Sequence, residues 1–194
     1  MRNLIIVCEE KCRSYGDYLA QLISLDDDTE ESIVGVKDGA VAAQVWSEKD
    51  YKSNAAQISS NQYILFIGNS KLIKEKSMNM NIKFDKYGMK YGWLGKQAML
   101  SVEKSVASDE YEDFVSFAKT YQSNIDTLIK KNSFGKNAAK VAGLGALFAV
   151  FGATVPVGVI AVKKLALTNK IKEQQYSCSI MKFYLDDLSS FLAI

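Results

Sequence analysis

The chain has 194 residues, of which 48% are hydrophobic and 24% are charged, a composition typical of a folded protein. Its 24 basic and 22 acidic residues leave a net charge of +2, which gives no electrostatic signal for nucleic-acid binding. The chain contains no histidine, which excludes Ser-His-Asp and Cys-His catalytic sites and histidine-ligated metal sites. Its three cysteines lack the spacing of a disulfide framework and favour a reducing setting. We therefore expect neither a metal nor a cofactor.

The first hundred residues alternate between apolar runs of strand length and amphipathic helical patterns. Ser47 fits a helix N-cap, because Glu48 and Asp50 follow it in the first turn. Strand–helix alternation predicts a parallel sheet, here a small Rossmann- or flavodoxin-like α/β domain over residues 1–107. The expected strands are 4–8, 32–36, a short 44–46 and 63–67, and the expected helices are 14–24, 48–60 and one that follows residue 70.

Parallel sheets bind ligands at the carboxyl ends of their strands. Those ends lie here at residues 8–13 and 68–71. The second of them offers backbone N–H groups at a helix start and the cation of Lys71, which together suit an anion such as phosphate. The alternative is an ordinary strand-to-helix turn. From these two ends we predict Glu9, Ser70 and Lys71 as ligand contacts.

Residues 86–96 hold three glycines, three aromatic residues and three lysines. Glycines allow a close backbone approach, while aromatic rings and lysines can stack on a base and neutralise its phosphates. One interpretation is a tight loop whose aromatic side chains fill the edge of the core. The other is a ligand-binding stretch, in which the predicted contacts are Tyr87, Tyr91, Trp93 and Lys96.

A helical region is expected over residues 108–194. It opens with an amphipathic helix at 108–131, closes with a further helix at 165–194, and contains a charge-free apolar segment at 141–162. That segment is long enough to cross a bilayer, and rows of small residues at four-residue spacing suit close packing of helices in lipid. The alternative is a buried hairpin that turns at Pro156. The small residues expected to mediate membrane assembly are Ala142, Gly145, Ala146, Ala149, Gly152 and Ala153.

The order strand, helix, Trp46, helix and then Tyr63 to Ser70 resembles the front half of TIR-type and related flavodoxin-like domains. The resemblance covers about the first hundred residues and implies an α/β fold there. TIR domains that cleave NAD use a glutamate in the helix after this region. The comparable stretch here ends in Gln97, so the resemblance implies a fold and not NAD cleavage.

These features predict a membrane-associated effector that is not an enzyme. The α/β domain would sense a nucleotide-like ligand or a protein partner, and the apolar segments of a homo-oligomer would assemble in the membrane, as in bacterial antiviral and toxin systems. Because residues 1–8 do not fit an export signal, we expect a cytoplasmic domain anchored at the inner (plasma) membrane. Two alternatives are cytoplasmic: a soluble nucleotide-handling enzyme that uses Glu9 or Glu10, and a soluble oligomeric interaction protein with a buried apolar hairpin.

Overall fold

The computed structural model describes residues 2–27, 34, 41–133 and 161–193. The chain has an α/β fold built on a six-stranded mixed sheet, in the order β2-β1-β3-β6-β5-β4. Four neighbouring strands, β2, β1, β3 and β6, are parallel, and β5 and β4 continue the sheet in antiparallel pairing. The strands are β1 (Arg2–Cys8), β2 (Val41–Ser47), β3 (Tyr63–Ile67), β4 (Asn81–Phe84), β5 (Met89–Leu94) and β6 (Gln97–Val102).

The neighbouring strands β1 and β3 are buried on both faces over residues 4–8 and 63–67. In β1, Leu4 and Ile6 belong to one hydrophobic cluster, while Ile5 and Val7 belong to another on the opposite face. Successive side chains of a strand point to opposite faces, so a strand covered on both sides must be apolar at every position. The continuous apolar runs predicted as strands at 4–8 and 63–67 are confirmed for this reason.

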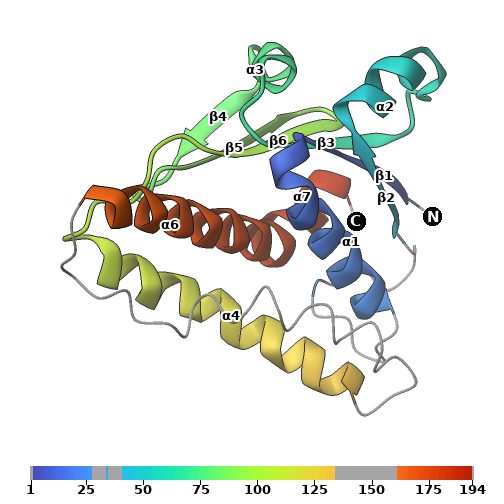
Figure 1. Cartoon of the computed structure of the whole chain (residues 1–194). Helices are drawn as coiled ribbons and strands as arrows, with labels where there is room; N and C mark the ends of the chain where they lie inside the picture. Colours follow the sequence, from blue (N-terminus) through green and yellow to red (C-terminus); the bar gives the residue numbers. More distant parts are fainter. Residues whose placement is uncertain (1, 28–33, 35–40, 134–160, 194) are drawn as a thin grey trace.

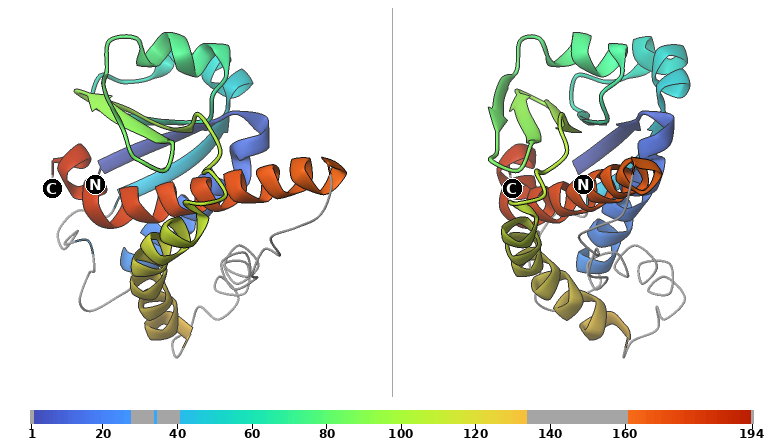
Figure 2. Two further views of the ribbon diagram at one scale, coloured as in Figure 1. Left: turned by 90° about the vertical axis from the view of Figure 1, so that its left-hand side faces the viewer. Right: turned by 60° about the vertical axis from the view of Figure 1, so that its left-hand side comes forward.

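Helices cover both faces of the sheet (Figure 1). One layer contains α1, α4 and α6, and the other contains the two short helices α2 and α3. Figure 2 shows α4 as the outermost helix, with its C-terminal end directed away from the sheet. The helices are η1 (Glu10–Cys12), α1 (Arg13–Asp27), α2 (Glu48–Asn54), η2 (Ala55–Gln57), α3 (Lys71–Ser77), α4 (Tyr111–Ser133), α6 (Ala161–Lys182), the π-helical turn η3 (Phe183–Asp187) and α7 (Leu188–Leu192).

The predicted parallel sheet is confirmed only in part, because β2, β1, β3 and β6 are parallel whereas β4 and β5 form an antiparallel hairpin. Gly88, in the turn between β4 and β5, has a φ of 76°, and Gly95, in the two-residue connection between β5 and β6, has a φ of 56°. Positive φ costs glycine little, which explains why glycines stand at these turns. Of the predicted strand at 32–36, only Val34 lies within the described residues. The described second strand, β2, extends the short strand expected at 44–46.

The predicted helix at 108–131 is confirmed as α4, and the region expected to be one helix at 165–194 is α6, η3 and α7 in succession. These helices share one hydrophobic core with α1 and the sheet. Phe114 and Ile125 of α4, Ile180 of α6 and Leu192 of α7 are buried together with Leu4 of β1. The helical region therefore packs directly on the α/β part of the chain.

Residues 141–160 of the apolar segment lie outside the described part of the chain, and so do the six small residues predicted to mediate membrane assembly. Its last two residues, Ala161 and Val162, open α6. Among the described helices, none combines the length and the apolar character that a membrane crossing requires.

Candidate functional site

The carboxyl ends of the parallel strands meet at one edge of the sheet. Cys8, the last residue of β1, is in register with Ser47 of β2 and with Ile67 of β3. The chain leaves β1 toward α1 on one face, and it leaves the adjacent strand β3 toward α3 on the other face (Figure 1). Connections that diverge from neighbouring strands leave a crevice between them, and this is where open α/β sheets bind ligands.

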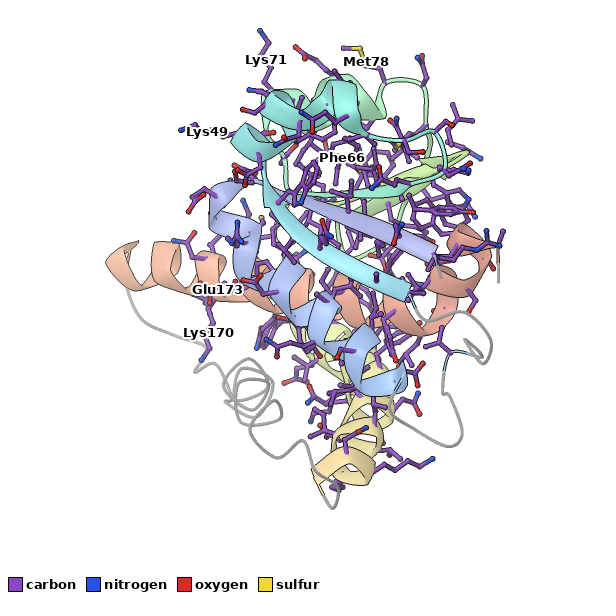
Figure 3. The ribbon with its side chains drawn as sticks, turned by 90° about the vertical axis from the view of Figure 1, so that its right-hand side faces the viewer. Lys49, Phe66, Lys71, Met78, Lys170 and Glu173 are labelled. Carbon is purple, nitrogen blue, oxygen red and sulfur yellow. The ribbon has the colours of Figure 1, made fainter. Side chains whose placement is uncertain are left out.

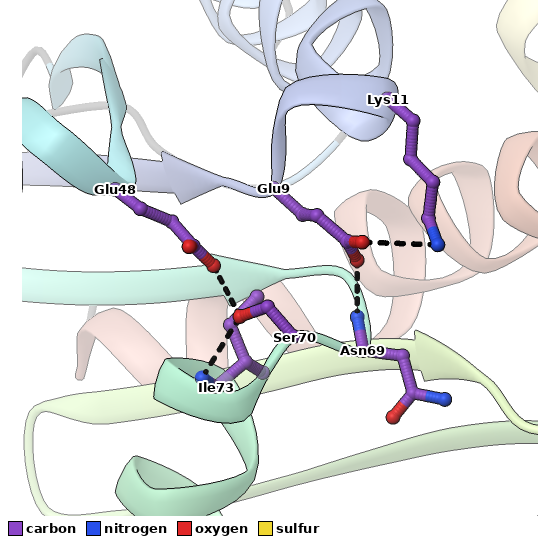
Figure 4. A network of polar contacts seen from close by, with 6 residues as sticks. All are labelled: Glu9, Lys11, Glu48, Asn69, Ser70 and Ile73. Carbon is purple, nitrogen blue, oxygen red and sulfur yellow. Dashed lines mark hydrogen bonds and ion pairs between the residues drawn. The ribbon is translucent and has the colours of Figure 1, made fainter.

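Glu9 joins the ends of β1 and β3 (Figure 4). Its Oε2 accepts a hydrogen bond of 2.8 Å from the backbone N–H of Asn69, and its Oε1 lies 2.9 Å from the Nζ of Lys11. The hydrogen bond that Lys11 donates to Glu9 raises the pKa of Lys11, which keeps that ammonium charged. Because both carboxylate oxygens already have partners, Glu9 holds the loop after β3 in position.

Ser70 is the N-cap of α3 (Figure 4). Its Oγ accepts from the backbone N–H of Ile73 at 3.2 Å, and its hydroxyl donates to the carboxylate of Glu48. Two carboxylates, those of Glu9 and Glu48, therefore border the start of α3, where an anion would meet negative charge. The side chain of Lys71 is 93% exposed and lies 3.9 Å from Glu75, so it points away from the crevice.

A hollow of about 410 Å³ opens beside Glu9. It is of the size that small-molecule sites have, about 300–1,000 Å³. The start of α1, the ends of β3 and β6, and helix α6 form its walls. The lining residues are Lys11, Cys12, Tyr15, Asn69, Val102, Glu103, Asn169, Lys172, Glu173 and Tyr176. We call this hollow the edge pocket.

The edge pocket combines aromatic rings with charges of both signs. Tyr15 of α1 and Tyr176 of α6 stack with ring centroids 5.1 Å apart and an interplanar angle of 18°. Lys11 and Lys172 supply positive charge, and Glu103 and Glu173 supply carboxylates. Ammonium groups can bind phosphate, whereas carboxylates accept hydrogen bonds from hydroxyl and amino groups. A polar ligand with both anionic and hydrogen-bond-donating parts fits this set of side chains.

The thiol in the edge pocket is not poised as a nucleophile. Burial raises the pKa of Cys12 to about 11, and burial likewise raises the pKa of Tyr15 and of Tyr176. These groups are therefore protonated at neutral pH, and a protonated thiol is a poor nucleophile. Within residues 2–27, 34, 41–133 and 161–193, no three Cys, Asp or Glu side chains are grouped to hold a metal ion.

The other predicted ligand residues lie elsewhere. Tyr87 is buried against the rings of Phe114 and Phe117 of α4. Tyr91 and Trp93 are half-buried and pack on the larger core cluster. Lys96 lies at the opposite edge of the sheet, where its Nζ donates to the carbonyl oxygen of Ser60 at 3.1 Å. The structure thus brings Glu9 and Ser70 to the same edge and separates them from these four residues.

None of the residues that line the edge pocket was predicted from the sequence as a ligand contact, although Lys11, Cys12 and Asn69 lie within the two strand ends at 8–13 and 68–71. Tyr15 and Tyr176 fit the apolar stripes of two helices, which is a signal of packing. Lys172 and Glu173 are ordinary charged residues of α6, more than 160 residues after Glu9. The sequence indicates one side of the pocket, because Glu9 follows the carboxyl end of a predicted strand. The other side is formed by α6, which reaches the pocket only through tertiary packing.

No protein-family model, no curated protein and no solved structure matches the chain. The sheet order β2-β1-β3 agrees with the start of the flavodoxin-like order, and the antiparallel pair β5-β4 departs from it. Fold likeness of this kind says little about activity. The functional argument therefore depends on the geometry of the edge pocket.

Proposed function

We propose that the chain is a membrane-associated effector whose α/β body senses a small ligand in the edge pocket. One observation carries this proposal: α6 forms a wall of the pocket and begins inside the apolar segment at 141–162. Asn169, the first pocket residue of α6, follows Val162 by seven residues, which is about two helical turns. A ligand held against α6 would thus act on the helix that leads out of the apolar segment.

The proposed ligand class is a nucleotide or a similar phosphorylated molecule. Lys11 and Lys172 would bind its phosphate groups, while Glu103 and Glu173 would accept hydrogen bonds from sugar hydroxyls or base amino groups. The lining has charge of both signs, which supports a ligand with distinct anionic and donor parts. A purely anionic ligand would meet repulsion from the two carboxylates.

Ligand binding would change the packing of α6 and so the assembly of the apolar segments. In this proposal the α/β body is cytoplasmic, the segment 141–162 enters the inner (plasma) membrane, and several copies associate through its rows of small residues. A ligand can shift such an equilibrium only by its difference in affinity between the two states. Contacts with α6 provide that difference if the helix moves on assembly.

The first test asks whether the full chain is an integral membrane protein. Membranes from expressing cells are extracted with alkaline carbonate and then with detergent. We expect release by detergent alone, since an inserted apolar segment resists carbonate. Release into carbonate, or a monodisperse protein in the soluble fraction, would refute membrane insertion and favour a buried apolar hairpin.

The second test addresses sensing. The full chain is reconstituted into dye-loaded vesicles, and leakage is measured with ATP or NAD as probes. Lys172→Gln should weaken the response to the active probe, while Lys170→Gln should leave it unchanged. Lys170 is a matched control because it lies on the same helix, outside the pocket lining, and points away from the sheet (Figure 3). Equal responses of both variants would contradict a ligand site on α6.

A further inference from the structure

The face of the sheet opposite α1, α4 and α6 is unevenly covered. Helices α2 and α3 lie over β1, β3 and part of β6, where a small cluster around Phe66 and Met99 is buried. The β4–β5 hairpin extends the sheet beyond these helices (Figure 1). We call the outer surface of α3 and of this side of the hairpin the lysine-rich face.

This part of the chain is strongly basic. Residues 71–96 contain seven lysines and two acidic residues, a net charge of +5 in a chain whose total is +2. The remainder of the chain is therefore net negative, at −3. Two of these lysines lie off the lysine-rich face: Lys83 is the strand neighbour of Phe84 and points to the opposite side of the sheet, and Lys86 lies 4.0 Å from Asp113 of α4. Both acidic residues are engaged: Glu75 lies 3.9 Å from Lys71, and the Asp85 carboxylate accepts the backbone N–H of Tyr87 at 2.6 Å.

The same stretch contains the exposed large apolar side chains of the described chain. Met78 is 77% exposed, Phe84 is 62% exposed and Leu94 is 59% exposed. Strand register places Phe84 opposite Lys90, and the Lys90 ammonium lies 5.3 Å from the Phe84 ring centroid. Leu94 follows Lys90 by four residues in β5, so alternation puts both on this face. Figure 3 shows Lys71 and Met78 projecting outward from α3.

A second hollow, of about 490 Å³, opens between α2, α3 and the starts of β3 and β6. Lys76, Lys96 and Leu94 are among the residues that line it, and none of its lining residues is acidic. Its remaining walls are the ring of Tyr51 and neutral polar or apolar side chains. A phosphate-bearing group with an apolar portion is complementary to this lining.

We infer that the lysine-rich face docks on the surface of an anionic lipid bilayer. Lysines near such a surface each add about 1 kcal/mol of attraction, and exposed apolar side chains enter the boundary between headgroups and acyl chains. The hollow beside Lys76 and Lys96 accepts a lipid headgroup. An acidic protein partner is less favoured by composition, because protein interfaces are enriched in arginine and depleted in lysine. Residues 71–96 contain no arginine.

The residues proposed to dock on the bilayer lie outside the apolar segment, so this proposal can be tested independently of membrane insertion. Its test uses the full chain with Leu94→Cys, labelled with an environment-sensitive dye. The three natural cysteines are at most 1% exposed, so the introduced thiol is labelled selectively. A matched control carries the dye at Ser116→Cys, an exposed position of α4 on the opposite layer.

The probes are vesicles of phosphatidylcholine with phosphatidylserine at a ratio of about 7:3, and vesicles of phosphatidylcholine alone. We expect the dye at position 94 to shift to shorter wavelength with the anionic vesicles alone, and the shift to be reversed by high salt. The dye at position 116 should not respond. Insertion of segment 141–162 would instead bind the chain to both kinds of vesicle and resist salt, so the two proposals fail separately.

Charge variants complete the test. Replacing Lys71, Lys74 and Lys76 by glutamine should weaken binding to anionic vesicles roughly fivefold per lysine, on the order of 100-fold together. The control replaces Lys104, Lys119 and Lys131 by glutamine, which lowers the net charge equally but outside this face. Equal weakening of binding in the two variants would overturn the inference. So would a dye at position 94 whose emission does not change with anionic vesicles, which is the result expected if the partner were an acidic protein.

Discussion

Replacement of Gln175 by leucine tests how α6 is held against the sheet. Gln175 is fully buried, and its Nε2 donates to two backbone carbonyl oxygens, those of Tyr87 and of Lys104. The first belongs to the turn between β4 and β5, and the second follows β6. One side chain thus joins α6 to two loops that are distant in the sequence.

The cost of Gln175→Leu follows from the groups that it leaves behind. Two carbonyl oxygens lose a donor, and each orphaned buried group costs about 1–3 kcal/mol. Leucine also removes the Gln175 Oε1, which has no hydrogen-bond partner among the described residues, and it adds apolar contact. These gains offset part of the loss, which leaves a destabilisation of about 2 kcal/mol. In a chain of this size that corresponds to a melting temperature lower by about 4–8 °C.

The measurement is urea unfolding followed by tryptophan fluorescence, with Gln57→Leu as the control. Gln57 is an exposed residue of η2, so the same chemical change there should alter the free energy of unfolding by less than about 0.5 kcal/mol. A Gln175→Leu variant as stable as the wild type would refute the reasoning. It would mean that the two carbonyl oxygens find other donors or water.

Three further predictions concern the core and its ionisable groups. Gly16→Ala should destabilise the protein by about 1–3 kcal/mol in urea unfolding despite its better helix propensity, because the new Cβ would collide with the Cys8 Sγ and lie 3.2 Å from the Ile6 Cγ2; unchanged stability would contradict this close packing of α1 on β1. Burial raises the pKa of Asp187, so the folded state favours the protonated form, and stability is lost as the pH rises through the folded pKa. Asp187→Asn should therefore raise the melting temperature at pH 7, and the difference from the wild type should narrow as the pH falls toward 3.8, the ordinary pKa of an aspartate. A difference that does not change with pH would contradict the burial of this carboxyl group as its cause. The three cysteines are buried, and their pKa values are raised, to about 12 for Cys8 and Cys178. They should therefore react slowly with a thiol reagent at pH 8 in the native protein, and all three should react in urea. Rapid labelling of the native protein would contradict their burial.

Local chemistry was enough to predict several elements. Residues 4–8 of β1 and 63–67 of β3 form continuous apolar runs because both faces of these strands are buried there, and this pattern is visible in the sequence. The helix at Ser47 follows from a capping box, in which Ser47 and Asp50 satisfy each other's backbone N–H groups. The charges at the two ends of α4 agree with its dipole.

The sequence by itself therefore determined the α/β class, the central strands and the long helix α4, because these depend on short-range periodicity and capping. Only the tertiary structure decided that residues 81–94 form an antiparallel hairpin that joins the parallel strands through β6, because the strand preference of a segment depends on what its two faces pack against. It also decided the edge pocket, in which Tyr15 meets Tyr176 across 161 residues of sequence. Such a site has no local pattern, because its two walls belong to helices that acquire a common surface only when both pack on the same face of the sheet.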